Sequence, residues 1–389
     1  MKVSLLTGGD DPSYAIPLMS SLASKGIEVD FIGNDQMQRS EAVNNERVNY
    51  LNLRGDQSEN APVTTKIIRV SKYYSRLVKY AFQTDSRIFH ILWLNKFILF
   101  DRTILNLYYK MLGKKLVFTA HNVNAGVRDG NDSLMNRLTL RFMYRIMDHI
   151  FVHTIKMKTQ LAKDFHVPHE KISVIPFGIN NFVPRSELKI SEARSRLGLH
   201  EDERALLFFG QIAPYKGLEL LISALNLLKT NGDNYRLIIA GKVKATYEKY
   251  WQMIRTMIKE CELEAHITER VEFIPDEEVE VYFKGADVLI LPYKDISQTG
   301  VLFLSYSFGL PAIATDVGSL NEEIVEGQTG FVCKPDDPED LAKKIGIYFE
   351  SSLFRNLEAK RREIEEYANE KYSWQAVAEA TYSVYAALQ

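Results

Sequence analysis

Short apolar runs alternate with amphipathic helical stretches along nearly the whole chain. The first series of runs is MKVSLLTGG, EVDFIG, IFHILWL, KKLVFTAHN, DHIFVHT and KISVIPFG. After a polar segment with two prolines, a second series follows with ALLFFG, YRLIIAG, RVEFIP, DVLILPY, PAIATD and TGFVCK. Strands that alternate with helices form parallel sheets covered by helices on both faces. The pattern therefore predicts two doubly wound α/β domains, residues 1–185 and residues 200–372.

The last segment, residues 373–389, is an amphipathic helix with one apolar stripe formed by Trp374, Val377, Thr381, Val384 and Leu388. We expect a packing helix that returns to the N-terminal domain. Ligands of doubly wound sheets bind at the carboxyl ends of the strands, so two such domains facing each other are expected to enclose a cleft.

Composition places the chain among globular proteins. Its 389 residues are 46% hydrophobic and 25% charged, which excludes a disordered or membrane-spanning class. The two cysteines, Cys261 and Cys333, are far apart and support neither a disulfide framework nor a thiolate metal site. The start MKVSLLTGG passes directly into DDPSY, and no apolar run reaches the ~20 residues of a spanning helix. We expect a cytoplasmic protein without a signal peptide.

No metal site is expected. The sequence contains no HExxH, DxD-like or clustered His/Cys pattern, and four histidines are scattered in ordinary surroundings, namely His149, His153, His166 and His169. We therefore predict that the protein works without a metal ion.

The charges are distributed unevenly, although the formal net charge is only −2. Residues 1–200 contain 28 Lys and Arg against 18 Asp and Glu, which leaves 20 basic and 32 acidic residues for the rest. A basic N-terminal part indicates a negatively charged partner, and a nucleic acid, an anionic membrane and a phosphorylated substrate all satisfy that condition.

Residues 65–81 form a basic amphipathic helical pattern without any acid. Its cations recur at three- and four-residue spacing, at Lys66, Arg69, Lys72, Arg76 and Lys79. One interpretation is attachment to an anionic membrane that presents a lipid-diphosphate acceptor. The alternative is an ordinary solvated face over a buried one. No recognition helix or RNP-like aromatic pair is visible, so we do not expect a nucleic-acid partner.

The stretch FFGQIAPYKGLELLISAL, residues 208–225, predicts an anion site. A buried strand ends at Gly210, and Lys216 precedes an amphipathic helix. Glycine lets backbone N–H groups approach a ligand, the helix start adds partial positive charge, and the lysine adds a full one. The spacing is neither the Walker pattern nor GxGxxG. The predicted anion site suits a diphosphate, although a lysine at the start of a helix is also commonly a solvated charge.

Taken together, these motifs resemble the family 4 retaining glycosyltransferases. That family has two Rossmann-like domains, the GT-B fold, and transfers sugars from nucleotide diphosphate donors. The resemblance spans the Gly8-Gly9 loop, TAHN (119–122), VIPFGIN (174–180), FFGQIAPYKG (208–217), ADVLILPY (286–293) and the stretch through GSLNEEIVEGQTGFV. It implies a retaining hexosyltransferase whose co-substrate is a UDP- or GDP-sugar, with no further cofactor.

The resemblance also implies roles for individual residues. Lys216 would bind the donor diphosphate, and His121 would face the transferred sugar, so these two are the expected catalytic residues. Gly8 and Gly9 would leave room for the diphosphate or the acceptor, and Glu322 would be an acid near the donor. The leaving phosphate itself would accept the acceptor's proton, so that no carboxylate nucleophile is needed.

The chain departs from the family pattern at two places. The arginine that commonly follows the phosphate-loop glycine is Gln211 here. The usual pair of glutamates, which has seven residues between its members, is also absent, because its positions fall on Ile296 and Leu304, or on Ser297 and Ser305 with a one-residue gap.

We therefore hypothesise that neutral donors at the start of the following helix bind the diphosphate, because the helix dipole favours an anion there. The residues concerned are Ser297, Gln298, Thr299, Gly300 and Val301, with Ser305 further along the helix. The alternative is that Ser297 or Thr299 only caps the helix.

The leading functional prediction is a retaining glycosyltransferase. It would extend a glycan or lipid-linked acceptor in the synthesis of a cell-surface polysaccharide, lipopolysaccharide or glycolipid, peripherally at the inner face of the cytoplasmic membrane. The missing acids and arginine motivate an alternative, a catalytically lapsed relative that binds nucleotide or glycan as a regulator. A sugar-nucleotide epimerase of the same fold is disfavoured, because the basic helix would then have no task.

Overall fold

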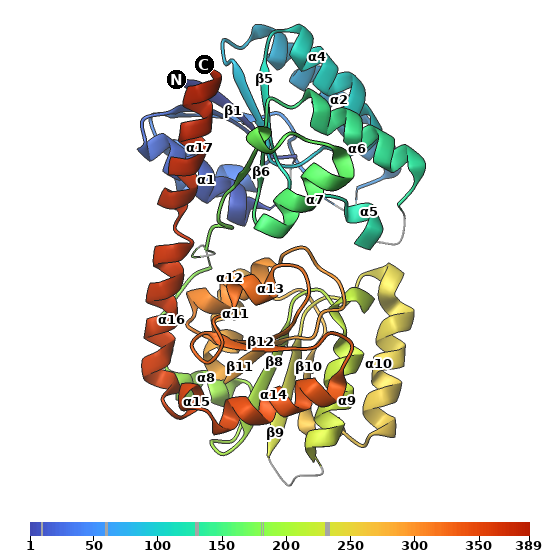
Figure 1. Cartoon of the computed structure of the whole chain (residues 1–389), viewed down its shortest axis with the longest axis vertical. Coiled ribbons are helices and arrows are strands. Elements are labelled where there is room, and N and C mark those ends of the chain that lie inside the picture. The colour runs from blue at the N-terminus through green and yellow to red at the C-terminus, as the bar shows by residue number, and fades with distance from the viewer. Residues whose placement is uncertain (9–10, 59–60, 129–131, 180, 182, 230–233) are drawn as a thin grey trace. The chain divides into compact units, whose positions relative to one another are not determined.

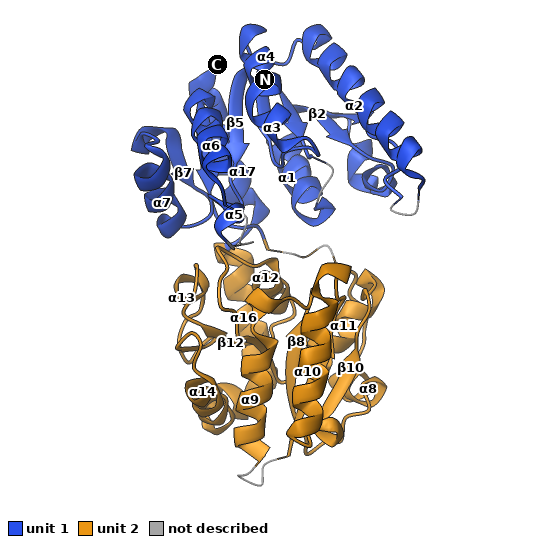
Figure 2. Ribbon diagram, turned by 90° about the vertical axis from the view of Figure 1, so that its right-hand side faces the viewer, with its two compact units in different colours: residues 1–178, 372–389 blue, residues 179–371 orange. Residues whose placement is uncertain are grey.

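The computed structural model describes residues 1–8, 11–58, 61–128, 132–179, 181, 183–229 and 234–389. These residues divide into two compact units, which Figure 2 shows in different colours. Unit 1 comprises Met1–Gly178 and Tyr372–Gln389, and unit 2 comprises Ile179–Lys371.

Unit 1 contains a seven-stranded sheet in the order β3-β2-β1-β4-β5-β6-β7, and all paired strands are parallel. Because β1 lies between β2 and β4, the strand order reverses beside β1, and such a switch point is where open α/β sheets bind ligands. The strands are β1 (Lys2–Leu6), β2 (Glu28–Gly33), β3 (Val48–Asn52), β4 (Ile88–Ile91), β5 (Lys115–Thr119), β6 (His149–Val152) and β7 (Ile172–Val174).

Helices cover both faces of this sheet (Figure 1). One face packs against α2 (Val63–Gln83), α4 (Asn106–Met111), α6 (Leu134–Ile146) and α7 (Ile155–Phe165) through one apolar cluster. The other face packs against α1 (Pro12–Ser24) and α17 (Trp374–Leu388) through a second cluster. The remaining helical segments are α3 (Ile98–Phe100), a π-helical turn (Asp101–Leu105), α5 (Ala125–Arg128) and 3-10 turns at Met37–Arg39, Glu41–Asn44 and His169–Lys171.

The C-terminal helix α17 packs beside α1 in unit 1. Its stripe differs slightly from the predicted one: Val377 and Thr381 are buried, and Ala378 and Tyr385 complete the buried face. The hydroxyl of Tyr385 lies 2.5 Å from Nδ1 of His90 on β4. A helix at the far end of the chain is therefore bonded to a central strand of the first sheet.

Unit 2 contains a six-stranded parallel sheet in the order β10-β9-β8-β11-β12-β13. The strands are β8 (Arg204–Phe209), β9 (Tyr235–Ala240), β10 (Ile267–Arg270), β11 (Val288–Leu291), β12 (Ala312–Thr315) and β13 (Gly330–Cys333). The helices are α8 (Ile190–Arg196), α9 (Leu218–Lys229), α10 (Glu248–Glu260), α11 (Asp276–Gly285), α12 (Gly300–Ser307), α13 (Leu320–Glu323), α14 (Pro338–Glu350), α15 (Ser352–Arg355) and α16 (Leu357–Lys371), with 3-10 turns at Pro214–Lys216, Ala245–Tyr247 and Glu264–His266.

The predicted class, two parallel α/β sheets covered by helices, is confirmed. One strand is shifted relative to the sequence pattern, because RVEFIP was expected as a strand and β10 instead ends at Arg270. The edge strand pairs Ile267–Arg270 with Leu237–Ala240, and the following apolar residues leave the sheet toward α11.

Candidate active site

In unit 2, three predicted site residues from separate segments meet where β8 ends. The N–H of Gly210 donates to the carbonyl of Ala240 (2.9 Å), and its φ of 94° lies in the left-handed region. A Cβ added at Gly210 would lie 3.1 Å from Nζ of Lys216 and 3.5 Å from Cγ2 of Val301. The Lys216 ammonium and the start of α12 therefore both lie close to Gly210, in space that a side chain at this position would occupy.

Lys216 is a buried cation, with a relative exposure of only 6%. Its Nζ lies 5.3 Å from the ring centroid of Tyr293, and no acid among the described residues forms an ion pair with it. Burial lowers the pKa of Lys216 to about 8, because an ammonium loses hydration in this position. Such a cation is stabilised by a bound anion.

The loop before α12 combines a helix cap with unpaired polar atoms. Thr299 is the N-cap, and its hydroxyl accepts a hydrogen bond from the N–H of Val301 (3.3 Å), so the capping interpretation holds for this residue. The amide nitrogen and oxygen of Gln298 are both buried and have no partner within the described part of the chain. Ser305 is fully buried, and its hydroxyl donates to the carbonyl of Leu310, so it serves the helix end.

The Gly-rich turn that precedes α13 lies against this loop. The N–H of Ser319 donates to the carbonyl of Ser297 (3.1 Å), and a Cβ at Gly318 would come within 1.9 Å of the carbonyl oxygen of Ile296. The hydroxyl of Ser319 is also buried without a partner among the residues described. Together with the Gln298 amide, it forms a group of buried polar atoms without partners, and such atoms carry a desolvation penalty until a ligand pairs with them.

The two adjacent carboxylates of α13 differ in environment. Glu322 is exposed, whereas Glu323 is buried and its Oε2 lies 3.8 Å from Nζ of Lys371. Gln211 is half-buried directly after Gly210. The donor-binding roles of Glu322 and Gln211 remain predictions.

In unit 1, two histidines are joined at the carboxyl ends of neighbouring strands. Nδ1 of His121, after β5, lies 3.0 Å from Nε2 of His153, after β6. Nδ1 of His153 lies 3.3 Å from the carbonyl oxygen of Ile175. A carbonyl only accepts, so neutral His153 donates from Nδ1 and accepts at Nε2 from His121. Nε2 of His121 is then an unprotonated acceptor, and it is buried with no partner among the described residues.

Both imidazoles are held neutral by burial. Burial lowers the pKa of His153 to about 4, although its bonds to the backbone act in the opposite direction. Burial is the largest cause that lowers the pKa of His121 well below its ordinary value, and the neighbouring His153 is the second. His121 is therefore suited to accept a hydrogen bond from a hydroxyl and unsuited to carry a positive charge.

Aromatic rings enclose His121. Trp93 stacks on it with centroids 4.3 Å apart and planes 7° apart, and Tyr14 meets it edge-on at 4.7 Å. Gly8 has a φ of 61°, and a Cβ there would lie 2.6 Å from the carbonyl oxygen of Trp93, so only glycine allows the β1 loop to come this close. Gly9 lies outside the described residues.

The sequence interpretation missed the part played by His153, which it placed among ordinary histidines. A signal was present, since DHIFVHT and KKLVFTAHN both place a histidine just after a buried strand. Two such histidines meet only if their strands are neighbours in the sheet. The pairing of β5 with β6 brings His121 and His153 together.

The basic helix predicted over residues 65–81 is α2, and its five cations differ in surroundings. Lys72, Arg76 and Lys79 are exposed, Arg69 pairs with Asp56 (2.6 Å), and Lys66 is half-buried. Within the described residues, no helix combines the length and apolarity needed to span a bilayer, and no three His, Cys, Asp or Glu side chains gather as a metal site.

Two family models match consecutive parts of the chain. Residues 13–181 match the model for glycosyltransferase family 4, and residues 189–371 match the model for glycosyl transferases group 1. A D-inositol 3-phosphate glycosyltransferase of Corynebacterium diphtheriae is 27% identical over 286 residues, which are 69% of this chain and 64% of that protein. An uncharacterized glycosyltransferase of Methanocaldococcus jannaschii is 27% identical over 236 residues, 59% of this chain and 57% of that protein. The chain thus matches somewhat more than half the length of these curated relatives.

Solved structures match the fold over the full length. Sucrose-phosphate synthase of Thermosynechococcus elongatus has a TM-score of 0.78 at 18% identity and covers 100% of this chain and 99% of its own. The Anabaena protein HepE in complex with UDP has a TM-score of 0.75 at 16% identity, with 100% of both chains covered. The two consecutive family matches and the GT-B-like architecture lead to one conclusion: the chain belongs to the family 4, or group 1, glycosyltransferases.

Proposed function

We propose that the protein transfers a sugar, with retention of anomeric configuration, from a nucleotide diphosphate sugar to a glycan or lipid-linked acceptor. The observation that carries this proposal is the buried ammonium of Lys216, which has no acidic partner among the described residues and lies beside Gly210 and Val301. Burying a charge without a counter-ion is unfavourable, so such a site is best explained by an anionic ligand. A diphosphate supplies that anion.

A UDP-sugar is the proposed donor. HepE, at 15–16% identity, was crystallised with UDP and with UDP-glucose, which supports a uridine nucleotide. The unpaired amide of Gln298 and the hydroxyl of Ser319 add donors and acceptors beside the proposed diphosphate site. A nucleotide that pairs with these atoms would remove their desolvation penalty.

The proposed chemistry is electrostatic. Breaking the anomeric C–O bond leaves negative charge on the diphosphate, which Lys216 and the N-terminal amides of α12 stabilise. The free Nε2 of His121 accepts a hydrogen bond from a hydroxyl of the transferred sugar. The departing phosphate oxygen takes the proton of the acceptor hydroxyl, so no side-chain nucleophile takes part.

The proposed acceptor class is a glycan or lipid-linked molecule used in cell-surface polysaccharide, lipopolysaccharide or glycolipid synthesis. Two structural relatives, WaaB and WaaG, are described as enzymes of lipopolysaccharide synthesis, with TM-scores of 0.63 and 0.62. The cations of α2, Lys66, Arg69, Lys72, Arg76 and Lys79, are proposed to face a negatively charged acceptor or membrane.

The test is release of nucleotide by the purified protein from UDP-, GDP- and ADP-sugars. We expect turnover with at least one donor, a loss of at least about 100-fold in Lys216→Met, and wild-type rates in the control Lys343→Met, which alters an exposed lysine on α14. Nucleotide binding without any turnover would instead identify a catalytically lapsed regulator. Full turnover in Lys216→Met would refute the proposed site.

A further inference from the structure

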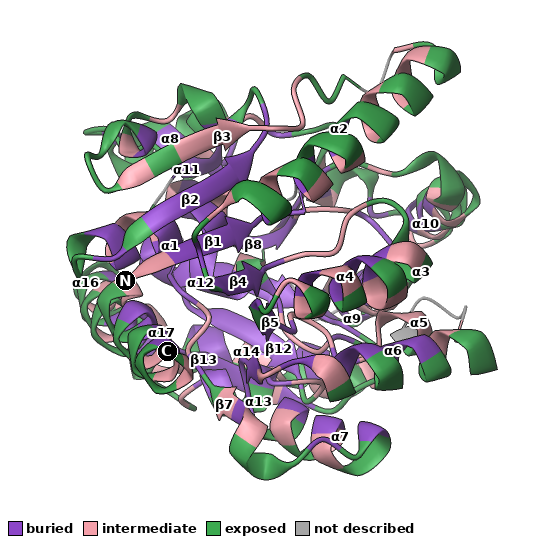
Figure 3. Ribbon diagram, turned by 90° about the horizontal axis from the view of Figure 1, so that it is seen from above, coloured by how far each residue is buried: buried purple, intermediate pink, exposed green. Residues whose placement is uncertain are grey.

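Three helical segments lie side by side over one face of the sheet in unit 1 (Figure 3). The hydroxyl of Tyr108 on α4 donates to the carbonyl of Val78 on α2 (3.2 Å). Arg102, in the π-helical turn before α4, donates to the side chain of Asn136 on α6 (2.7 Å). We refer to the exposed side of α2, of residues 97–111 and of α6 as the outer helix surface.

The outer helix surface is unusually apolar. Among the described residues, fourteen of the twenty-three exposed large apolar side chains lie on it, and unit 2 as a whole has five. Those on residues 97–111 and on α6 include Ile104, Leu107, Met111, Leu134, Met135 and Leu138, of which Met111 is 79% and Leu134 75% exposed. Single exposed apolar residues are ordinary, but a gathering of this extent marks an interaction site.

The same surface is strongly basic. The helical segments at Val63–Gln83, Ile98–Met111 and Leu134–Ile146 contain ten Lys and Arg residues and a single acid, Asp101, which is buried. Five of the cations are exposed and form no ion pair with any described residue: Lys72, Arg76, Lys79, Arg141 and Arg145. A second copy of the chain would bring like charges together here, so self-association is disfavoured.

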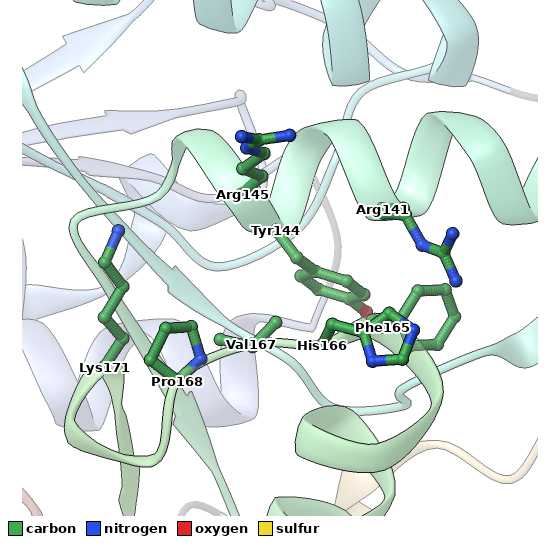
Figure 4. A pocket seen from close by; sticks show the side chains of 8 residues that line it. All are labelled: Arg141, Tyr144, Arg145, Phe165, His166, Val167, Pro168 and Lys171. Carbon is green, nitrogen blue, oxygen red and sulfur yellow. The ribbon is translucent and has the colours of Figure 1, made fainter.

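A cationic pocket of about 510 Å³ lies at the C-terminal end of α6 (Figure 4). Arg141 and Arg145 extend from α6 and Lys171 from the segment after α7, beside the rings of Tyr144 and Phe165, and no carboxylate lines it.

Two of these cations already bond backbone carbonyls at helix ends. Arg141 donates to the carbonyl of Asp164 (3.4 Å) and Lys171 donates to that of Met147 (3.2 Å). Further N–H donors of each side chain stay available for phosphate oxygens.

We propose that the outer helix surface docks onto an anionic lipid bilayer, with the apolar side chains of residues 97–111 and of α6 inserted and a lipid phosphate bound in the pocket at the end of α6. Exposed apolar side chains bordered by cations, with almost no acid, are the composition of helices that lie at a membrane interface. The proposal extends the membrane-side role of α2 to two further segments and does not rest on the transfer activity.

The test is co-sedimentation of the full chain with vesicles of phosphatidylcholine, alone or mixed with phosphatidylglycerol. Leu107→Ser with Met111→Ser removes apolar insertion, and Arg141→Ser with Arg145→Ser removes pocket charge. The matched control, Arg255→Ser with Lys259→Ser, removes two exposed cations from α10 in unit 2. We expect binding that requires phosphatidylglycerol, weakens with salt, falls at least about tenfold in both test variants and is unchanged in the control. Binding to neither vesicle, or equal losses in the control, would overturn the proposal.

Four further measurements distinguish membrane docking from the other possible occupants of the outer helix surface. Amide hydrogen exchange is expected to slow over residues 98–111 and 134–146 when vesicles are added. Light scattering without vesicles is expected to give one chain per particle, and a dimer lost in Leu107→Ser with Met111→Ser would assign the surface to self-association instead. Binding of soluble glycerol phosphate without vesicle binding would also refute membrane docking. Nucleotide release from the donor, measured on the same variants, is expected to be unchanged, which separates this proposal from that of the active site.

Discussion

Nε2 of His153 lies 3.0 Å from Nδ1 of His121, and this pair decides which nitrogen of His121 is available. His153 is oriented in turn by the carbonyl of Ile175, so it acts as a positioning residue that holds His121 in one tautomer. A neutral imidazole with a buried lone pair is an acceptor for hydroxyls, which is the role that a sugar substrate requires.

His153→Leu is expected to lower kcat/KM for sugar transfer by about tenfold, because His121 loses the acceptor that fixes its tautomer. His153→Gln retains an amide oxygen able to accept from Nδ1 of His121 and should stay within about threefold of the wild type. Nitrogen NMR of the His121 ring reports the tautomer directly. Equal rates in the two variants, with an unchanged His121 tautomer, would contradict this role.

Nucleotide diphosphate affinity is expected to depend on pH through Lys216. Burial lowers the pKa of this group to about 8, so the ammonium that is proposed to bind the diphosphate is present below that pH and is lost as the pH rises through it. If only the ammonium form binds, affinity falls about tenfold per pH unit above pH 8. Lys216→Arg stays charged over this range, so its affinity should be constant. Calorimetric titration with UDP at successive pH values checks both, and a pH-independent wild type would exclude the mechanism.

Gln298→Leu is expected to weaken the binding of UDP without lowering the stability of the free protein. The buried amide of Gln298 lacks a partner among the described residues, so removing it should leave the thermal unfolding temperature of the free protein unchanged or raised. If the amide pairs with the nucleotide, affinity for UDP should fall about tenfold, which corresponds to ~1.4 kcal/mol. Gln252→Leu on the exposed side of α10 is the matched control. Undiminished affinity in Gln298→Leu would show that this amide does not contact the donor.

Substitution of Arg361 is expected to be among the most destabilising changes in unit 2. Its buried guanidinium donates to the carbonyls of Phe283 (3.0 Å), Phe308 (3.2 Å) and Ala286 (2.5 Å), and so ties α16 to the ends of α11 and α12. Arg361→Met leaves these acceptors unpaired and should lower the free energy of unfolding by about 3 kcal/mol.

Urea unfolding measures this difference. Arg362→Met, which alters the exposed neighbour, should change stability little, because surface ion pairs contribute little. Similar losses in the two variants would show that the carbonyl contacts of Arg361 contribute no special stability.

Much of the architecture follows from the sequence alone. The alternation of strands and helices predicts two parallel sheets because it depends on local periodicity, which neighbouring residues determine. The proposed anion site at Gly210 and Lys216 could also be predicted from the sequence, because a strand end, a glycine and a lysine at a helix start lie within a few residues of one another.

Only the tertiary structure decided which distant segments meet. The order of the strands pairs His121 with His153, and the contact between two loops leaves Gln298 and Ser319 buried without partners among the described residues. The packing of α2, α4 and α6 in one layer turns apolar positions of separate helices into one exposed surface. Burial, pairing and neutral charge states arise from contacts between residues far apart in the chain, and local periodicity carries no information about them.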